Sequence, residues 1–174
     1  ERVLAESEAL KTFNPSGRVD LRKTPLITID PPDARDHDDA VWAAPDDDPA
    51  NPGGFQTIVA IADVATYVKP GSALDKEARF RGNSVYFPDR VVPMLPERIS
   101  NDLCSLREKE DRPALACFMI FDKSGTKKSH RFARAIMRSA AKLSYEEAQA
   151  AIDGRSNAKT DVLLEGVLKP LWKA

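Results

Sequence analysis

A run of aspartates between residues 28 and 40, TIDPPDARDHDDA, limits the folds that this chain can adopt. It follows the apolar segment Pro25–Ile29, and its Pro-Pro pair removes backbone donors and so ends the predicted strand. Two carboxylates about 4 Å apart repel by roughly 4 kcal/mol at an effective dielectric near 20. A fold that gathers several of them needs hard cations, and oxygen ligands suit Mg²⁺ or Mn²⁺. The candidate ligands, in the spacing D-x5-D-x-D-D, are Asp30, Asp36, Asp38 and Asp39.

The acidic run has other interpretations. A solvated acidic loop with no ligand is the simplest alternative. A calcium loop counted from Asp36 would place Asp38 at the third position, but Ala40 falls at the fifth and no glycine stands at the sixth, so this template fails. We expect His37 to be a loop or packing residue rather than a metal ligand.

Composition indicates one water-soluble domain. The chain has 174 residues, of which 42% are hydrophobic and 30% are charged. No apolar run approaches the length of a membrane span, and the polar, acidic start ERVLAESEAL does not resemble a signal peptide. Cys104 and Cys117 lack the spacing of a zinc or redox motif, so we expect buried thiols in a reducing cytoplasm.

Charge is distributed unevenly along the chain. The net charge is only −1, but nucleic-acid binding depends on local basic patches rather than on the total. The second half is rich in basic residues, which are a candidate RNA-binding patch or simply the solvated face of a hairpin: Lys123, Lys127, Lys128, Arg131, Arg134, Arg138 and Lys142.

The predicted strands lie in two groups. Around the acidic run we expect short strands at Pro25–Ile29 and Ala40–Ala43, then the turn-rich loop Asp46–Gly54 and a long strand over Phe55–Val68. In that last strand Asp63 faces away from the apolar side chains, where it either supports the metal site or is an ordinary polar residue. The second group is an antiparallel hairpin of Ala114–Phe121 and Lys127–Ser139 joined at Asp122–Gly125.

The predicted helices are marked by capping residues. Ser72 and Asp75 predict a helix that ends at Gly82, and Ser144 and Glu147 predict one that runs to about Ile152. Asn83–Pro88 is a short strand, Pro93–Leu106 is irregular and then helical, and Thr160–Ala174 is helical and apolar on one side. The expected fold is α+β, a mixed but mostly antiparallel sheet with helices packed on one side and the acidic loop at one end.

Three blocks of the sequence resemble a known family. TIDPPDARDHDDAV, VAIADVATYVKPGSALDKEARFRGNSVYFPDRVVPMLPE and NDLCSLREKEDRPALACFMIF occur in the same order in the RNase II/RNase R family of RNB-domain exoribonucleases, and the match is nearest to its RNase R branch. The likeness runs from about Gly17 to Gln149. It implies that residues 1–174 are an N-terminal part of the catalytic domain, with a lead-in segment at 1–20 and a truncated helix at 160–174.

The resemblance also implies an activity. Family members hydrolyse single-stranded RNA from the 3′ end to nucleoside 5′-monophosphates, using Mg²⁺ (or Mn²⁺) held by the aspartates that match Asp30, Asp36, Asp38 and Asp39. Tyr86, in NSVYFPD, matches the family tyrosine that packs on the 3′-terminal nucleotide, whereas the neighbouring Phe87 is expected in the core. Arg35 has either a structural or a phosphate-contacting role. The family's flanking cold-shock and S1 domains and its later active-site arginine have no counterpart here.

Three functions follow from these observations. The chain is a fragment of a cytoplasmic exoribonuclease with no obligate protein partner, an RNA-binding but catalytically incompetent fragment, or a non-nuclease domain with an acidic metal-binding loop. Because the chain ends inside an apolar helix, we also expect Leu163, Leu168 and Trp172 to be exposed.

Overall fold

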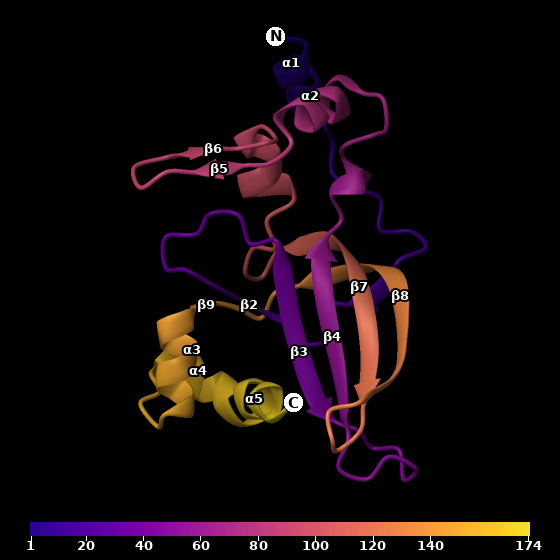
Figure 1. Cartoon of the computed structure of the whole chain (residues 1–174), viewed down its shortest axis with the longest axis vertical. Coiled ribbons are helices and arrows are strands. Elements are labelled where there is room, and N and C mark those ends of the chain that lie inside the picture. Colours follow the sequence, from indigo (N-terminus) through magenta and orange to yellow (C-terminus); the bar gives the residue numbers. More distant parts are fainter.

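The computed structural model describes residues 1–174, which form one large sheet with helices at two of its borders (Figure 1). The sheet has seven strands in the order β1-β8-β7-β4-β3-β2-β9. Their bounds are β1 (Val19–Leu21), β2 (Ile27–Asp30), β3 (Asp39–Pro45), β4 (Phe55–Ala62), β7 (Asp111–Phe121), β8 (Lys127–Arg138) and β9 (Ala141–Ser144).

The strand pairing is mixed. The run β2-β3-β4-β7-β8 is antiparallel throughout, whereas β1 pairs in parallel with β8 and β9 pairs in parallel with β2. The predicted α+β class and the predicted hairpin, β7–β8, are therefore confirmed. The two parallel edge pairings were not predicted, because they join short segments that lie far apart in the sequence.

The central strands alternate between two faces, as a half-buried sheet requires. Ala60, Ala116 and Ala135 are fully buried and belong to the main core, together with Leu26, Leu74 and Ile99 from outside these strands. Strand β4 is shorter than predicted, because it ends at Ala62 and the chain turns at Asp63 into the 3-10 helix η1 (Val64–Thr66).

The helices form two groups rather than one layer. At one end of the sheet, α1 (Arg2–Ala9) packs against α2 (Ala73–Arg81) and against the π-helical segment η2 (Arg98–Leu103). Helix α2 begins and ends as predicted, with Ser72 as N-cap and Gly82 at a φ of 79° as C-cap. The expectation that all helices cover one side of the sheet is therefore wrong.

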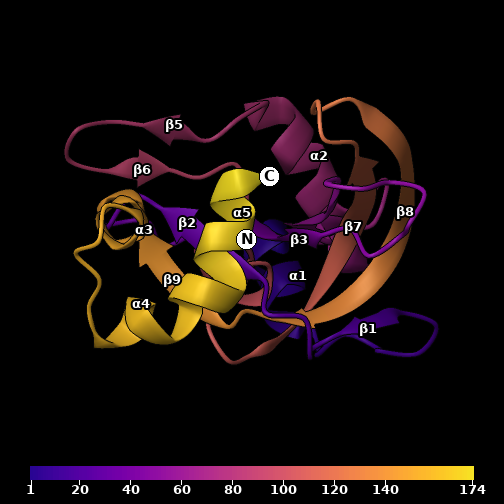
Figure 2. The ribbon, with the colours of Figure 1, turned by 90° about the horizontal axis from the view of Figure 1, so that it is seen from below.

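The second group of helices covers the β2–β9 border (Figure 2). Helix α3 (Tyr145–Ile152) follows β9 directly, and the predicted C-terminal helix is divided into α4 (Ala158–Leu163), the π-helical η3 (Leu164–Leu168) and α5 (Lys169–Lys173). Leu163 and Leu168 are buried in a second core with Ile27, so their expected exposure is wrong. Trp172 is 64% exposed, as expected.

A two-stranded arm projects from the end that carries α2. It consists of β5 (Val85–Tyr86) and β6 (Val91–Val92), and Figure 1 shows it extending on the same side as the loop between β2 and β3. Phe87 is 45% exposed and lies under the Arg90 guanidinium, so its assignment to the core was wrong. No helix in the chain combines the length and the apolar character that spanning a membrane would need.

Candidate active site

The acidic loop connects two neighbouring strands at one end of the sheet. Asp30 is the last residue of β2 and Asp39 is the first residue of β3, and these strands are antiparallel with Ile27 opposite Val41. The Asp38 carbonyl accepts a hydrogen bond of 2.8 Å from the Ala62 amide at the end of β4. Strand geometry therefore places the first and the last aspartates of the run at the same end of the sheet.

A segment after η2 fixes the middle of the loop. The Ser105 hydroxyl accepts from the His37 amide and donates to the Arg35 carbonyl, both at 3.2 Å. The Leu106 amide donates to the His37 carbonyl at 2.8 Å. Ser105 and Leu106 are both buried, so these bonds are shielded from water. No local pattern in the sequence marks Ser105 for this role.

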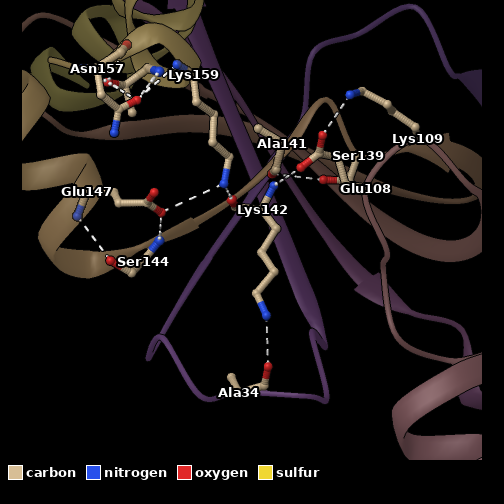
Figure 3. Close-up of polar contacts among 11 residues, drawn as sticks. Ala34, Glu108, Lys109, Ser139, Ala141, Lys142, Ser144, Glu147, Asn157 and Lys159 are labelled. Atoms are coloured by element: carbon tan, nitrogen blue, oxygen red, sulfur yellow. Dashed lines mark hydrogen bonds and ion pairs between the residues drawn. The ribbon is translucent and has the colours of Figure 1, made fainter.

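Lys142 attaches the start of the loop to β9. Its ammonium group donates to the Ala34 carbonyl at 2.9 Å, and its own backbone amide donates to Glu108 Oε2 at 3.2 Å (Figure 3). The Lys142 carbonyl in turn accepts from the Lys159 ammonium. Lys142, which the sequence placed in a candidate RNA-binding patch, is therefore occupied by contacts within the chain.

His37 lies beneath the loop and contacts the first aspartate. Its Nδ1 is 2.8 Å from Asp30 Oδ2, and the two side chains are only 5% and 15% exposed. The two side chains are therefore within hydrogen-bonding distance of each other in a place that is largely shielded from water. The expectation that His37 packs in the loop agrees with this position, and the contact with Asp30 adds a role in orienting that carboxylate.

Tyr86 reaches the acidic loop from the arm. Its hydroxyl donates to Asp36 Oδ2 at 2.9 Å, and the side chain is 65% exposed. The hydrogen bond to Asp36, followed by partial desolvation, raises the pKa of the Tyr86 phenol. The ring therefore stands beside the acidic loop with most of its surface open to solvent.

The carboxylates of the loop disfavour one another's charge. Partial desolvation by the surrounding protein and the negative charges of Asp36, Asp39 and Asp30 raise the pKa of Asp38 to about 6, against a smaller lowering by His37. Desolvation and the charge of Asp30 likewise raise the pKa of Asp39. Such mutual repulsion is the electrostatic condition that a divalent cation would relieve.

The side chains do not form a preassembled metal cluster. No group of three or more His, Cys, Asp or Glu side chains is arranged so that it could hold an ion, and Asp30 and Asp36 contact His37 and Tyr86 instead. The donor types fit Mg²⁺ or Mn²⁺, because all four are carboxylates. The metal site accordingly stays a prediction that rests on this chemistry.

Two further candidates have separate places in the structure. Arg35 is held in the loop through its carbonyl, and its side chain is exposed. Asp63 is buried in an ion pair with Arg18, at 2.8 Å between Nη2 and Oδ2. No hydrogen bond or ion pair joins the Asp63 side chain to the acidic loop, so the structure does not support a role for Asp63 in that site.

The fold and the loop together define a class of α+β domains that hold an acidic loop at one end of a mixed sheet. Within this class, the chain belongs to the RNB-domain family, whose model, described as RNB domain, matches residues 18–171.

Named relatives agree with the family. Ribonuclease R of Vibrio parahaemolyticus is 54% identical over 138 residues, which are 79% of this chain and 16% of that protein. The structure of Mycoplasma genitalium RNase R in complex with ribose-methylated single-stranded RNA has a TM-score of 0.90 at 32% identity, covering 98% of this chain and 27% of that one. The chain thus spans only a minor part of the length of these relatives.

A more distant structure shares the fold alone. Yeast Ssd1, described as a pseudonuclease, has a TM-score of 0.71 at 20% identity, covering 85% of this chain and 18% of that one. A fold of this kind does not by itself establish cleavage, because activity resides in particular side chains.

Proposed function

We propose that the chain forms part of the catalytic domain of a Mg²⁺-dependent exoribonuclease that shortens single-stranded RNA from the 3′ end and releases nucleoside 5′-monophosphates. The observation that carries the proposal is the set of four aspartates on a loop fixed at the sheet end, where three neighbouring carboxylates contribute to raising the pKa of Asp38 to about 6. Membership of the RNB-domain family supports the reaction class.

Asp30, Asp36, Asp38 and Asp39 would hold the metal ions. When bound beside a phosphodiester, such ions activate the attacking water and stabilise the departing oxygen. The role of the chain itself is to position these carboxylates. Ser105 and Lys142 fix the loop backbone, and His37 orients Asp30.

Tyr86 would bind the terminal nucleotide. Its exposed ring stands beside Asp36, and stacking of a base on an aromatic face contributes about 1–3 kcal/mol without selecting a sequence. The exposed Arg35 side chain, one residue before Asp36, would contact a phosphate. This arrangement suits an enzyme that removes nucleotides one after another from RNA of any sequence.

The decisive variant is Asp38→Asn, with Asp33→Asn as its control. Asp33 is an exposed aspartate of the same loop that is not in the ligand set, so both changes remove one negative charge from one segment. We expect Asp38→Asn to abolish mononucleotide release with RNA binding nearly intact, and Asp33→Asn to retain turnover. Undiminished release by Asp38→Asn in a chromatographic assay would refute the assignment.

Direction and metal dependence are tested with the same substrate. RNA labelled at its 5′ end should give a descending ladder of products with Mg²⁺ and none with EDTA. Immediate release of labelled mononucleotide would contradict 3′→5′ digestion.

A second candidate function is RNA binding without cleavage. It is favoured by the absence of a preassembled group of three ligands and by the engagement of Asp30 and Asp36 with other side chains. It predicts tight binding of labelled RNA and no product at any Mg²⁺ concentration. Calcium-selective binding without affinity for RNA would instead favour a non-nuclease metal-binding domain.

A further inference from the structure

The hairpin of β7 and β8 concentrates positive charge outside the acidic loop. From Asp122 to Arg138 the sequence holds six basic side chains and one acidic side chain, whereas the whole chain has a net charge of −1. The rest of the molecule is therefore distinctly acidic. Figure 2 shows β8 as the outermost long strand, on the opposite side of the molecule from β2 and β9.

Most of this strand has a neighbour on one side only. β1 pairs with β8 only from Ala135 to Met137, so the part of β8 that precedes Ala135 is bonded to β7 alone. Residues 127–132 and Arg134 are all exposed. The basic side chains discourage another protein strand from pairing with this open edge. They would attract a polyanion.

One face of this part of the sheet is apolar and aromatic. The pairing aligns Val59, Cys117 and Phe132 in one row and Ile61, Leu115 and Arg134 in the next. Phe132 is 64% exposed, Ile61 45% and Leu115 44%. The rings of His130 and Phe132 meet edge to face with centroids 5.6 Å apart, which confirms that both lie on this face. An exposed aromatic ring on a sheet is a surface on which an unpaired base can stack.

The cations beside this face are available to a ligand. The Arg134 guanidinium is 62% exposed and lies 3.8 Å from Asp63, whose shorter contact of 2.8 Å is with Arg18. Arg134 also lines a cavity of about 460 Å³ together with Lys11 and Lys69. At the other end of the strand, the exposed Lys127 pairs with Phe121, which lies on the same face of β7 as Met119, the partner of His130. Positive charge thus lies at both ends of the aromatic face.

We propose that this face, which we call the β8 platform and define by Lys127, His130, Phe132 and Arg134, binds single-stranded RNA outside the acidic site. A base would stack on Phe132, and Lys127 and Arg134 would contact phosphates on either side of it. Successive side chains on one face of a strand are about 7 Å apart, so these residues can follow an extended strand of nucleotides. One part of this proposal rests on the proposed function, namely the choice of RNA as the polyanion.

Stacking is tested with Phe132→Ala against Phe80→Ala. Phe80 on α2 is 88% exposed and serves as the matched aromatic control. Binding of a fluorescent single-stranded homopolymer RNA is measured by anisotropy in EDTA, which separates binding from cleavage. We expect Phe132→Ala to weaken binding by roughly 5- to 150-fold and Phe80→Ala to leave it unchanged. Equal effects of the two variants would overturn the proposal.

Phosphate contact is tested with the double variant Lys127→Gln/Arg134→Gln. Its control is Arg2→Gln/Lys173→Gln, which removes the same charge from exposed positions on α1 and α5. For single-stranded RNA, each lost phosphate contact reduces the magnitude of the slope of log affinity against log salt by about 0.7. The magnitude should therefore fall by about 1.4 in the first variant and stay unchanged in the control. An unchanged slope, or an equal loss in the control, would refute the contacts.

Competition identifies the occupant. If polyglutamate or base-free polyphosphate displaces the RNA as well as unlabelled RNA does, the platform is a general anion patch or a protein contact, and the proposal fails. These binding results are independent of turnover. If the wild-type protein releases no mononucleotide but Phe132→Ala still weakens RNA binding, only the proposed function is refuted. If turnover is normal but Phe132→Ala leaves RNA binding unchanged, only the platform is refuted.

Discussion

Single side chains at the acidic loop are held in different ways. Asp30 and Asp36 each have a partner, His37 and Tyr86, whereas Asp38 and Asp39 are exposed and carry the raised pKa values. Tyr86 combines two features in one residue, because its ring is open to solvent and its hydroxyl contacts Asp36. Substitution can separate these features.

Tyr86→Ala and Tyr86→Phe should differ in their products. Phenylalanine keeps the stacking face and loses only one hydrogen bond, worth about 0.5–1.5 kcal/mol, whereas alanine loses about 1–3 kcal/mol of stacking. We therefore expect the alanine variant to alter the length of the shortest RNA product and the phenylalanine variant to preserve it. A denaturing gel resolves the two, and identical product ladders for wild type and Tyr86→Ala would count against stacking.

The Cys104 thiol should not react with alkylating reagents in the folded protein. It is 3% exposed, and burial, followed by the charges of Asp38 and Asp63, raises the pKa of its thiol to about 12. Since the thiolate is the reactive form, alkylation at mildly alkaline pH should modify Cys104 only after denaturation. Peptide mass spectrometry checks this, and rapid labelling of Cys104 in the native protein would contradict it. The half-buried Cys117 provides the internal comparison.

Helix α3 depends on hydrogen bonds in its first turn. Ser144 Oγ accepts from the Glu147 amide at 3.1 Å, and Glu147 Oε2 accepts from the Ser144 amide at 2.9 Å. Helix α2 is capped differently. Ser72 accepts from the Asp75 amide, while Glu6 accepts from the amides of Ala73 and Leu74. The loss of one hydroxyl should therefore matter more in α3.

Ser144→Ala should destabilise the protein by about 1 kcal/mol, within a usual range of about 0.5–2 kcal/mol for such caps. Ser72→Ala should cost less, because Glu6 remains to accept from the first turn of α2. Urea unfolding monitored by circular dichroism measures both. A larger loss for Ser72→Ala than for Ser144→Ala would contradict the assigned roles.

Elements with local signals were predictable, and those fixed by distant partners were not. Capping residues located α2 and α3, and the turn at Asp122–Gly125 located the β7–β8 hairpin. Strands β1 and β9 have three and four residues and exist through parallel pairing with remote strands. The spacing of the aspartates made them candidate ligands, which stays a prediction. Ser105 and Lys142 hold the loop through backbone carbonyls, which leave no pattern in a sequence.

One buried ion pair joins the segment before β1 to the sheet. Arg18 contacts Asp63 at 2.8 Å and the Ala135 carbonyl at 3.3 Å, and the two charged side chains are 7% and 6% exposed. Burial acts to raise the pKa of Asp63, but hydrogen bonding and the charge of Arg18 outweigh it, so the net pKa is lowered. The pair therefore stabilises the fold above the ordinary carboxyl pKa, and this contribution is lost as the pH falls below it.

Asp63→Asn should lower the free energy of unfolding by about 3–5 kcal/mol at neutral pH, because Arg18 is left buried without its counter-charge. The difference from wild type should shrink in acid. Asp20→Asn is the control, since the Asp20–Arg22 pair is 54% and 42% exposed and contributes little. Chemical unfolding over a series of pH values tests this. A pH-independent difference would show that the charge of Asp63 is not what stabilises the fold.

The parallel pairing of β2 with β9 has a consequence for biosynthesis. Ile27 and Ala141 are neighbours in the sheet although most of the chain separates them, and Lys142 then secures Ala34. While a ribosome is still translating the intervening residues, Lys142 has not yet been made. The loop that carries the aspartates therefore lacks its contact at Ala34. Because contacts between such remote positions form slowly, the acidic loop of a nascent chain should reach its final position late, after the β3–β4 hairpin has formed.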